Sequence, residues 1–359
     1  MNIFEPMAAH DYEQVIAFQN RSSGLRGFLA IHDTTLGPAL GGVRIKRYAN
    51  EEEALTDALR LSRAMTYKAS LAGLPCGGGK TVLLLHDGLQ REAAFEDFGQ
   101  MVEGLHGRYF CARDVGIADA DLVAIARTTR FVARDPSPEL GDVSEHTARG
   151  VWQGMRACLE WAGIKGRARV AIQGVGSVGR FLARILRAEG MDLVVADVDA
   201  ARAADVARET GARVEAPEDI LATPCDVLAP CALGGVINPA SLARLQCRIL
   251  CGSANNVLAT IEDGDALERR GVLYAPDYLV NAGGLIRGAE FFLLGRADSS
   301  ESIARLYPRM RSVLELARER GISTARAADE LAESRLKKAK KFSDLTWENA
   351  RRVSSPAQV

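Results

Sequence analysis

A glycine-rich turn between two apolar segments constrains the fold of this chain more than any other feature. Gly174, Gly176 and Gly179 satisfy the pattern G-x-G-x-x-G. The turn follows the strand-like segment 168–173 and opens the helix-like segment 180–190. In such a turn the first glycine permits a tight bend, the second lets the backbone approach a pyrophosphate, and the third lets the helix pack on the strand. The sequence therefore predicts a βαβ unit that binds a dinucleotide.

The residues after this turn indicate which dinucleotide is bound. Asp197 ends the apolar segment 192–197, about 20 residues beyond the turn, where a carboxylate accepts hydrogen bonds from the adenosine ribose. A carboxylate here repels the 2′-phosphate of NADP, so we expect NAD, although the nearby Arg202 leaves NADP open. The expected cofactor-binding set is Gly174, Val175, Gly176, Ser177, Val178, Gly179 and Asp197.

The length and charge of the chain exclude several classes of protein. The 359 residues predict two domains, since one domain takes roughly 150 residues. Lys plus Arg number 45 against 46 Asp plus Glu, which gives no overall field for binding nucleic acid or an anionic membrane. No apolar stretch approaches the roughly 20 residues of a spanning helix. We therefore expect no nucleic-acid or membrane partner, and we expect the basic run 335–342 to be a solvated helix end or tail.

The cysteines and histidines indicate a reducing compartment and no metal. The seven cysteines are odd in number and include no C-x-x-C pair, and the five histidines include no metal-binding spacing such as H-E-x-x-H. Free thiols in apolar segments are typical of cytoplasmic proteins. The first residues also lack the apolar region of a secretory signal. We expect a cytoplasmic location and no metal site.

A second glycine cluster, 77–79, directly precedes Lys80. A phosphate-binding P-loop would need G-x-x-x-x-G-K-[ST] at the start of a helix, but Leu74 stands where its first glycine belongs. The apolar run 81–85 is typical of a buried strand rather than a helix. The cluster is therefore expected to be a loop that holds Lys80 at the start of a strand, for a purpose other than phosphate binding.

Two more polar residues stand at notable places in the N-terminal part of the chain. Lys68 lies near the end of a helix predicted over 50–73, with Asn50 as its N-cap, and Asp114 lies in a turn after a strand-like segment. Alone, Lys68 could interact with the helix dipole and Asp114 could cap a turn. Beside a nucleotide-binding domain, they and Lys80 indicate a site that anchors a substrate and moves protons.

Six segments of the sequence carry a resemblance to a known family. They read LGPALGGVR, RLSRAMTYKASLAGLPCGGGKTV, RDVGI, APCALGGVIN, GSANN and YAPDYLVNAGGLI. In this order they resemble the leucine, phenylalanine and valine dehydrogenases of the amino-acid dehydrogenase superfamily. The resemblance implies NAD-dependent, reversible oxidative deamination of an apolar L-amino acid to a 2-oxo acid and ammonia by a homo-oligomer. The alternative is a non-catalytic dinucleotide-binding paralogue with a regulatory role, which would not need Lys68, Lys80 and Asp114 all to be intact.

The resemblance, together with the alternation of short apolar runs and helices in the second half of the chain, predicts an α/β fold with two domains. We expect an N-terminal α/β domain at 1–135 that binds substrate and forms the oligomer, and a doubly wound Rossmann domain at 145–290 that binds NAD. The C-terminal helices, 291–359, are expected to return to the first domain and to end in the basic tail. The segment 135–144, dense in Pro, Gly, Asp and Ser, is the expected crossing between the domains.

The resemblance also implies roles for individual residues. Lys68 would bind the α-carboxylate, Lys80 would activate the hydrolytic water, and Asp114 would carry a proton to and from the amine nitrogen. Burial and a second nearby lysine would lower the pKa of one lysine towards neutrality, which suits a general base. The other residues implied are Gly41 and Gly78, whose carbonyls would hold the ammonium group, Asn256 at the substrate, and Thr147 and Asn281 at the cofactor.

The side-chain pocket is expected to be lined by Leu40, Ala112, Leu285 and Gly288. Leucine-type relatives usually have a branched aliphatic residue at the last position. The glycine therefore leaves a void that slightly favours Phe or Trp over Leu or Val, unless the segment 290–292 fills it. Because one methylene changes discrimination by only about 1–3 kcal/mol, the preferred amino acid stays open.

Four residues depart from the family pattern, namely Arg113, Glu145, His146 and Arg287. If Arg113 paired with Asp114, it would lower the pKa of that carboxyl and hinder its proton transfer. His146, beside Glu145, is expected to be a solvated hinge residue. Arg287 is the one added cation that could favour an acidic substrate such as glutamate.

Overall fold

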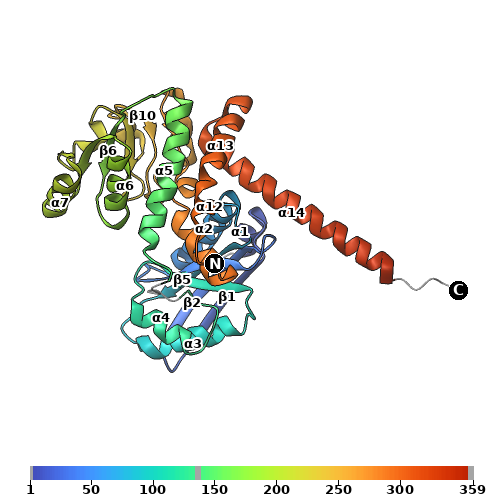
Figure 1. Cartoon of the computed structure of the whole chain (residues 1–359). Coiled ribbons are helices and arrows are strands. Elements are labelled where there is room, and N and C mark those ends of the chain that lie inside the picture. The colour runs from blue at the N-terminus through green and yellow to red at the C-terminus, as the bar shows by residue number, and fades with distance from the viewer. Residues whose placement is uncertain (1–2, 134–138, 355–359) are drawn as a thin grey trace. The chain divides into compact units, whose positions relative to one another are not determined.

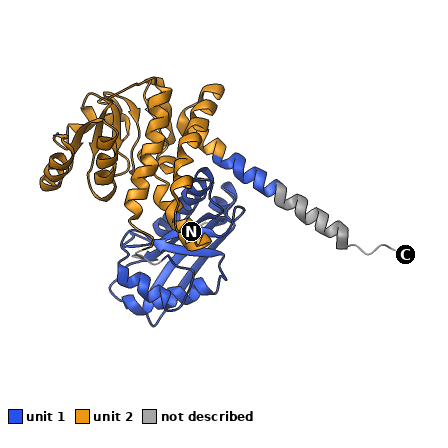
Figure 2. Cartoon of the chain, in the orientation of Figure 1, with its two compact units in different colours: residues 1–138, 332–359 blue, residues 139–331 orange. Residues whose placement is uncertain are grey.

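The chain forms two compact α/β units (Figure 2). The structure, a computed structural model, describes residues 3–133 and 139–354, with side chains as far as residue 341. Unit 1 combines Met1–Pro138 with Ala332–Val359, and unit 2 is Glu139–Leu331. The two-domain α/β fold expected from the sequence is confirmed.

The first unit is built around a mixed sheet (Figure 1). Its elements are α1 (Phe4–Ala9), β1 (Gln14–Asn20), β2 (Leu25–Asp33), β3 (Ala39–Lys46), α2 (Glu51–Leu71), β4 (Gly77–Leu84), α3 (Arg91–Glu103), β5 (Tyr109–Arg113) and α4 (Asp119–Ala126). The described strands follow the order β1-β2-β4-β3-β5, in which β3 runs parallel to both of its neighbours. Alternate residues of β2 enter two different core clusters, one with α2 and one with α3 and α4. Helices therefore cover both faces of this sheet.

Helix α2 carries Lys68 in its last turn. Asn50 is its N-cap, as expected, because the side-chain oxygen of Asn50 accepts a hydrogen bond of 2.9 Å from the backbone N–H of Glu53. Acidic residues fill the first turn and complement the helix dipole. Buried residues at helical spacing, such as Leu55 and Leu59, then fix the face that packs on the sheet.

Glycines bring β4 into close contact with α2 and with β3. A Cβ atom on Gly78 would lie 2.1 Å from the backbone nitrogen of Thr66 in α2, and one on Gly41 would lie 1.7 Å from the carbonyl oxygen of Gly79. Only glycine allows backbones to approach so closely. Residues 77–79 also pair with β2 and β3. They are therefore part of β4, and the loop expected before the strand was wrong.

The second unit is a doubly wound parallel sheet. Its elements are α5 (Val143–Trp161), β6 (Arg169–Gln173), α6 (Ser177–Ala188), β7 (Asp192–Ala196), α7 (Ala200–Thr210), β8 (Arg213–Val214), η1 (Ile220–Ala222), β9 (Cys225–Pro230), α8 (Pro239–Leu242), β10 (Cys247–Leu250), α9 (Ile261–Arg269), β11 (Leu273–Tyr274), α10 (Asp277–Val280), α11 (Gly283–Leu294), α12 (Ser300–Ala304) and α13 (Leu306–Arg320). The described strands follow the order β11-β10-β9-β6-β7-β8, and every pair is parallel. The order reverses between β6 and β9, which is where such sheets bind dinucleotides. The expected Rossmann fold is confirmed.

The C-terminal helices return to the first unit later than expected. Helices α12 and α13 pack on α5 within unit 2, because α13 presents a buried apolar stripe that includes Leu306, Met310 and Val313. Helix α14 (Thr324–Ser354) begins in unit 2, and it belongs to unit 1 only from Ala332 onward (Figure 2).

Two other segments also differ from the sequence-based expectation. The expected domain crossing at 135–144 falls partly outside the described residues, and α5 already begins at Val143. The basic run is not simply a solvated tail, since Arg335 is half-buried and Lys340 pairs with Asp33 at 3.2 Å. Within the described ranges, we find no helix with the length and apolar character that crossing a bilayer would demand.

The fit between α2 and β4 gives a stability prediction. Replacing Gly78 by Ala should lower the free energy of unfolding by about 3 kcal/mol, because α2 must move away from the added methyl group. Gly104→Ala is the matched control. Gly104 is exposed at the end of α3 with φ −63°, and its added Cβ would come no closer than 3.4 Å to the nearest atom. Denaturant titration followed by far-UV circular dichroism measures both, and equal stability of the two variants would contradict the close fit.

Candidate functional site

The centre of the site in unit 1 is a buried ion pair between Lys80 and Asp114. Lys80 lies in β4 with 5% of its surface exposed, and Asp114 follows β5. The Lys80 Nζ atom lies 2.6 Å from Oδ2 of Asp114. Between them, on β3, a Cβ atom on Gly42 would lie 2.7 Å from Cβ of Asp114 and 3.0 Å from Nζ of Lys80. The absence of a side chain at Gly42 therefore lets the two groups meet.

Arg44 is a part of this site that the sequence analysis missed. Its Nε donates to Oδ2 of Asp114 at 2.9 Å, and its Nη1 donates to Oδ2 of Asp57 at 2.9 Å. Asp57 also accepts a hydrogen bond of 2.8 Å from the hydroxyl of Tyr48. Positive and negative groups thus alternate from Lys80 through Asp114 and Arg44 to Asp57. Because side chains alternate along a strand, Arg44 lies on the same face of β3 as Gly42 and the expected pocket residue Leu40. This alternation could have identified Arg44 from the sequence.

The surroundings of the ion pair change the acidity of both groups. Burial lowers the pKa of Lys80, and the Arg44 charge lowers it further, while Asp114 acts in the opposite direction without cancelling the effect. Burial alone would raise the pKa of Asp114, but the charges and hydrogen bonds of Lys80 and Arg44 outweigh it, so this pKa lies below its usual value. The site therefore holds a carboxylate beside a lysine that releases its proton more readily than a solvated lysine.

Arg113 does not pair with Asp114, contrary to the pairing considered from the sequence. Its guanidinium contacts the carboxylate of Asp119 at the start of α4. Asp114 instead receives Arg44, which reaches it from the neighbouring strand. The concern that Arg113 hinders the proton transfer of Asp114 is therefore removed.

The other residues expected in unit 1 lie on the same sheet or on α2. The carbonyl oxygen of Gly41 accepts a hydrogen bond of 3.0 Å from the buried hydroxyl of Tyr109. Leu40 is buried and pairs across the strands with Gly78. The half-buried Ala112 pairs with Gly42, next to the ion pair. Lys68 projects from the last turn of α2, the helix that packs on β4.

In unit 2 the glycine turn has the geometry expected of a dinucleotide site. Gly174 has a φ of 90°, a conformation that favours glycine. A Cβ atom on Gly179 would lie 2.0 Å from the carbonyl oxygen of Gly174, so the third glycine lets α6 pack on the end of β6. A Cβ atom on Gly176 would meet nothing within 4 Å, so the backbone beside the helix N-terminus is open to a phosphate. Val175 is buried under the turn, Ser177 is exposed and Val178 is half-buried.

Asp197 connects this turn to the end of β7. Its Oδ2 accepts a hydrogen bond of 2.9 Å from the backbone N–H of Val175, and its Oδ1 accepts one of 2.9 Å from Asp199. Arg202 lies 3.2 Å from Asp197 and 3.3 Å from Asp199, so two carboxylates neutralise its charge. Oδ1 accepts from both Asp199 and Arg202, whereas Oδ2, which accepts from Val175, retains acceptor capacity for a ribose hydroxyl. The turn and Asp197 therefore fit a dinucleotide.

Three further residues expected near the ligands also lie in unit 2. Asn281 is 3% exposed, and its amide donates to the carbonyl of Ser253 at 3.2 Å and to the side-chain oxygen of Asn255 at 2.9 Å. Its own side-chain oxygen is buried without a partner, so a ligand donor would satisfy it. Thr147 donates to the carbonyl of Val143 at 2.9 Å within α5. Asn256 adopts a left-handed conformation, with φ 52°, after β10.

Helix α11 carries both pocket residues of unit 2, the half-buried Leu285 and Gly288. A Cβ atom on Gly288 would meet nothing within 4 Å. The segment 290–292 therefore does not fill this space, since Phe291 instead stacks on the guanidinium of Arg287 at 5.0 Å. The space beside Gly288 is therefore open within unit 2, and its part in a side-chain pocket stays a prediction.

Arg287 is a structural residue in unit 2. It is 2% exposed and donates to the backbone carbonyls of Leu140 and Arg296, each at 2.9 Å, and to that of Glu139. These contacts hold the first residues of the unit, so the guanidinium is already engaged by backbone and does not serve as a cation for an acidic substrate.

Glu145 and His146 are the other two residues that depart from the family pattern, and their surroundings differ. Glu145 pairs with Arg149 at 2.7 Å on the surface of α5. His146 is half-buried rather than solvated, its Nδ1 has no partner, and burial together with the Arg287 charge lowers its pKa.

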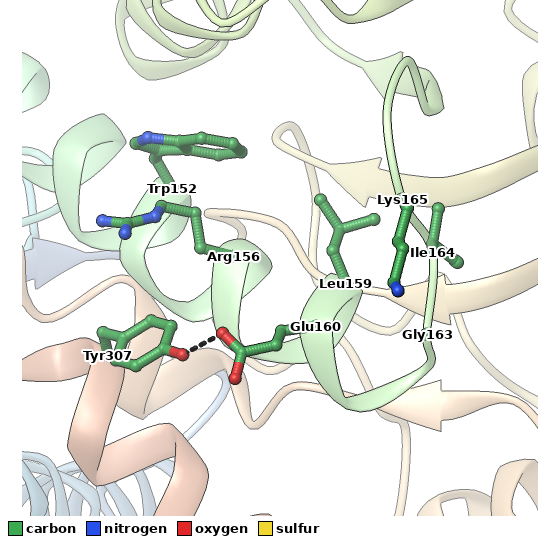
Figure 3. A pocket seen from close by; sticks show the side chains of 8 residues that line it. All are labelled: Trp152, Arg156, Leu159, Glu160, Gly163, Ile164, Lys165 and Tyr307. Atoms are coloured by element: carbon green, nitrogen blue, oxygen red, sulfur yellow. Dashed lines mark hydrogen bonds between the residues drawn. The ribbon is translucent and has the colours of Figure 1, made fainter.

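One cavity of about 300 Å³ lies between α5 and α13 (Figure 3). Its lining is amphipathic and comprises Trp152, Arg156, Leu159, Glu160, Gly163, Ile164, Lys165 and Tyr307. The hydroxyl of Tyr307 donates to Glu160 across it. None of the site residues expected from the sequence lines this cavity. Over the described residues, no group of three or more His, Cys, Asp or Glu side chains is placed to hold a metal.

Comparison with known proteins identifies similar sequences over nearly the whole chain. Residues 12–131 match the family described as Glu/Leu/Phe/Val dehydrogenase, dimerisation domain, and residues 196–340 match Glutamate/Leucine/Phenylalanine/Valine dehydrogenase. Leucine dehydrogenase of Geobacillus stearothermophilus is 42% identical over 99% of both chains. Phenylalanine dehydrogenase of Caldalkalibacillus thermarum is 39% identical over 91% of this chain and 92% of its own. The crystal structure of L-tryptophan dehydrogenase from Nostoc punctiforme aligns with a TM-score of 0.86 and 37% identity, covering 94% of this chain and 100% of that one.

The alternating charges of the site give a second stability prediction. Arg44→Met should lower the free energy of unfolding by about 3 kcal/mol, because Asp57 and Asp114 would lose the cation between them. Arg47→Met is the matched control, since Arg47 lies on the same segment but pairs with Asp87 at the surface, where water screens the ion pair. Hydrogen exchange of β3 and β4 peptides, measured by mass spectrometry, reports the local free energies. Equal effects of the two substitutions would contradict the network.

Proposed function

Because the chain belongs to the Glu/Leu/Phe/Val dehydrogenase family, we propose that it catalyses the reversible, NAD-dependent oxidative deamination of an apolar L-amino acid. The products are the 2-oxo acid and ammonia. The observation that carries this proposal is the buried Lys80–Asp114 pair, 2.6 Å apart, in a chain that matches amino-acid dehydrogenases over nearly its full length. Such a pair supplies both a base and a proton carrier.

The residues of unit 1 that were expected to contact the substrate each have a proposed role in this reaction. Lys68 binds the substrate carboxylate as a cation. The carbonyl oxygens of Gly41 and Gly78 accept hydrogen bonds from the substrate ammonium group. Asp114, kept anionic by Lys80 and Arg44, exchanges a proton with the amine nitrogen.

The chemistry of Lys80 follows from its lowered pKa. NAD held by the Gly174–Gly179 turn and Asp197 would supply the hydride acceptor through which the substrate amine becomes an iminium group. Lys80 in its neutral form takes a proton from the water that attacks the iminium carbon, and burial together with the Arg44 charge lowers its pKa, so that this form is reached at lower pH than in a solvated lysine. As the carbinolamine collapses, Asp114 returns to the leaving nitrogen the proton that it took from the substrate ammonium group before oxidation. Its carboxylate then accepts the proton of the carbinolamine hydroxyl as ammonia leaves.

Three observations support NAD as the cofactor. The carboxylate of Asp197 would repel a 2′-phosphate. Arg202, the nearby cation, is held by Asp197 and Asp199 and is not available to bind that phosphate. The open backbone at Gly176 and the unpaired side-chain oxygen of Asn281 would receive the pyrophosphate and a ligand N–H group. Thr147 joins this cofactor set.

The substrate proposal rests on the pocket residues and on the relatives. None of the proposed pocket residues, Leu40 and Ala112 in unit 1 and Leu285 and Gly288 in unit 2, has a polar side chain, and Asn256 is the proposed polar substrate contact. The open space at Gly288 admits an aromatic side chain as well as a branched one. Relatives named for leucine, phenylalanine and tryptophan all act on apolar amino acids. The engaged guanidinium of Arg287 argues against glutamate.

We also propose that the enzyme works in the cytoplasm as a homo-oligomer assembled through unit 1. The match of residues 12–131 to a family described as a dimerisation domain supports assembly through that unit. The seven cysteines are all free, and most are buried, which supports a reducing compartment.

The test is steady-state NADH formation, at mildly alkaline pH, from a panel of L-amino acids with NAD and NADP in parallel. We expect turnover of an apolar amino acid with NAD, and we expect Lys80→Ala to lower kcat by about 10²–10⁴-fold while NAD binding is kept. Lys46→Ala is the control, because Lys46, half-buried at the end of the neighbouring strand, pairs with Glu53 and not with Asp114. Absence of turnover across the panel, despite NAD binding, would support the regulatory alternative instead.

A further inference from the structure

The basic run near the C-terminus contains one residue that contacts the end of the Lys68 helix. The guanidinium of Arg335, on α14, donates to the carbonyl oxygens of Ser70 at 2.7 Å, Leu74 at 3.0 Å and Ala69 at 3.3 Å. These carbonyls belong to the last turn of α2 and to the turn that leads into β4. All of these residues lie in unit 1.

This contact adds charged donors to a helix end whose carbonyls at Ala69 and Ser70 already accept from the backbone N–H groups of Leu74 and Gly73, each at 3.0 Å. The last four carbonyls of an α-helix have no partner within the helix, and they carry the negative end of its dipole. Arginine suits them because its planar group offers several donors in fixed directions. Arg335 is half-buried, so these bonds are partly shielded from competing water.

Neighbouring residues connect the same two segments. The hydroxyl of Ser70 donates to the carbonyl of Ala332 at 2.9 Å, and the hydroxyl of Tyr67 donates to Oε1 of Glu333 at 2.8 Å. Tyr67 precedes Lys68, and Ser70 follows it by two residues. The backbone on both sides of Lys68 is therefore fixed by α14.

We propose that Arg335 is a positioning residue that holds the last turn of α2 so that Lys68 meets the substrate carboxylate. The proposal rests on the carboxylate-binding role proposed above for Lys68. Arg335 joins the last turn of α2 at Ser70 to Leu74 in the turn that follows. Helix ends fray readily, so loss of Arg335 loosens this turn and displaces the Lys68 ammonium group. Lys80 is affected less, because it lies inside β4 between two paired strands.

Loss of Arg335 is therefore expected to change KM for the substrate but not kcat. Arg335→Ala should raise KM for the amino acid and for the 2-oxo acid about tenfold or more, while kcat and the Kd of NAD stay close to the parent values. Lys338→Ala is the matched control, since Lys338 is exposed on the same helix, and it should change none of these constants. Guanidinium chloride at low concentration should partly restore KM of Arg335→Ala, whereas sodium chloride at equal ionic strength should not.

Two parallel variants keep the test decisive. Lys68→Ala should raise both KM values at least as much as Arg335→Ala does. If Lys68→Ala raises KM and Arg335→Ala does not, the positioning role is overturned and the proposed function stands. If Lys68→Ala leaves KM unchanged, the carboxylate role of Lys68 fails, and the positioning role fails with it.

Arg335→Lys is the variant to use if Arg335→Ala does not fold. It keeps the charge but not the planar group of several donors, so it is expected to give an intermediate KM. A parent-like KM would overturn the proposal.

Discussion

Burial of the Lys80 ammonium group beside the Asp114 carboxylate is the interaction on which the rest of unit 1 depends. A buried charge is costly unless it is paired and hydrogen-bonded. The structure meets this requirement by alternating charges, with Arg44 between Asp114 and Asp57. The same arrangement leaves Lys80 with a lowered pKa and Asp114 ionised, so the groups that stabilise the pair also prepare it for proton transfer.

Glycine makes this arrangement sterically possible. Gly42 leaves room for the pair itself, and Gly78 lets α2 lie against the strand that carries Lys80. The end of α2 receives further hydrogen bonds from Arg335 on α14. In unit 2 the missing side chains of the glycine turn let α6 pack on β6 and leave the backbone at Gly176 open.

The sequence predicted those parts of the protein that depend on local pattern. The Rossmann turn, the N-cap at Asn50 and the α/β alternation are each specified by residues close together in the chain, and the structure confirms them. Arg44 and Arg335 were missed because their partners, Asp114 and Ser70, lie 70 and 265 residues away. The possible pairing of Arg113 with Asp114 was considered because the two residues are neighbours in the chain. In the structure Arg113 contacts Asp119 instead, and the neighbouring strand supplies Arg44 to Asp114.

The most direct test of this account is the pH dependence of kcat/KM for amino-acid oxidation in the parent enzyme, Asp114→Asn and Arg44→Met. The parent should show a limb for Lys80 below the ordinary lysine value of 10.5. Asp114 raises the pKa of Lys80 and Arg44 lowers it, so the limb should move to lower pH in Asp114→Asn and to higher pH in Arg44→Met. Shifts in the same direction, or an unchanged limb in both variants, would contradict the claim that this charge network sets the acidity of Lys80.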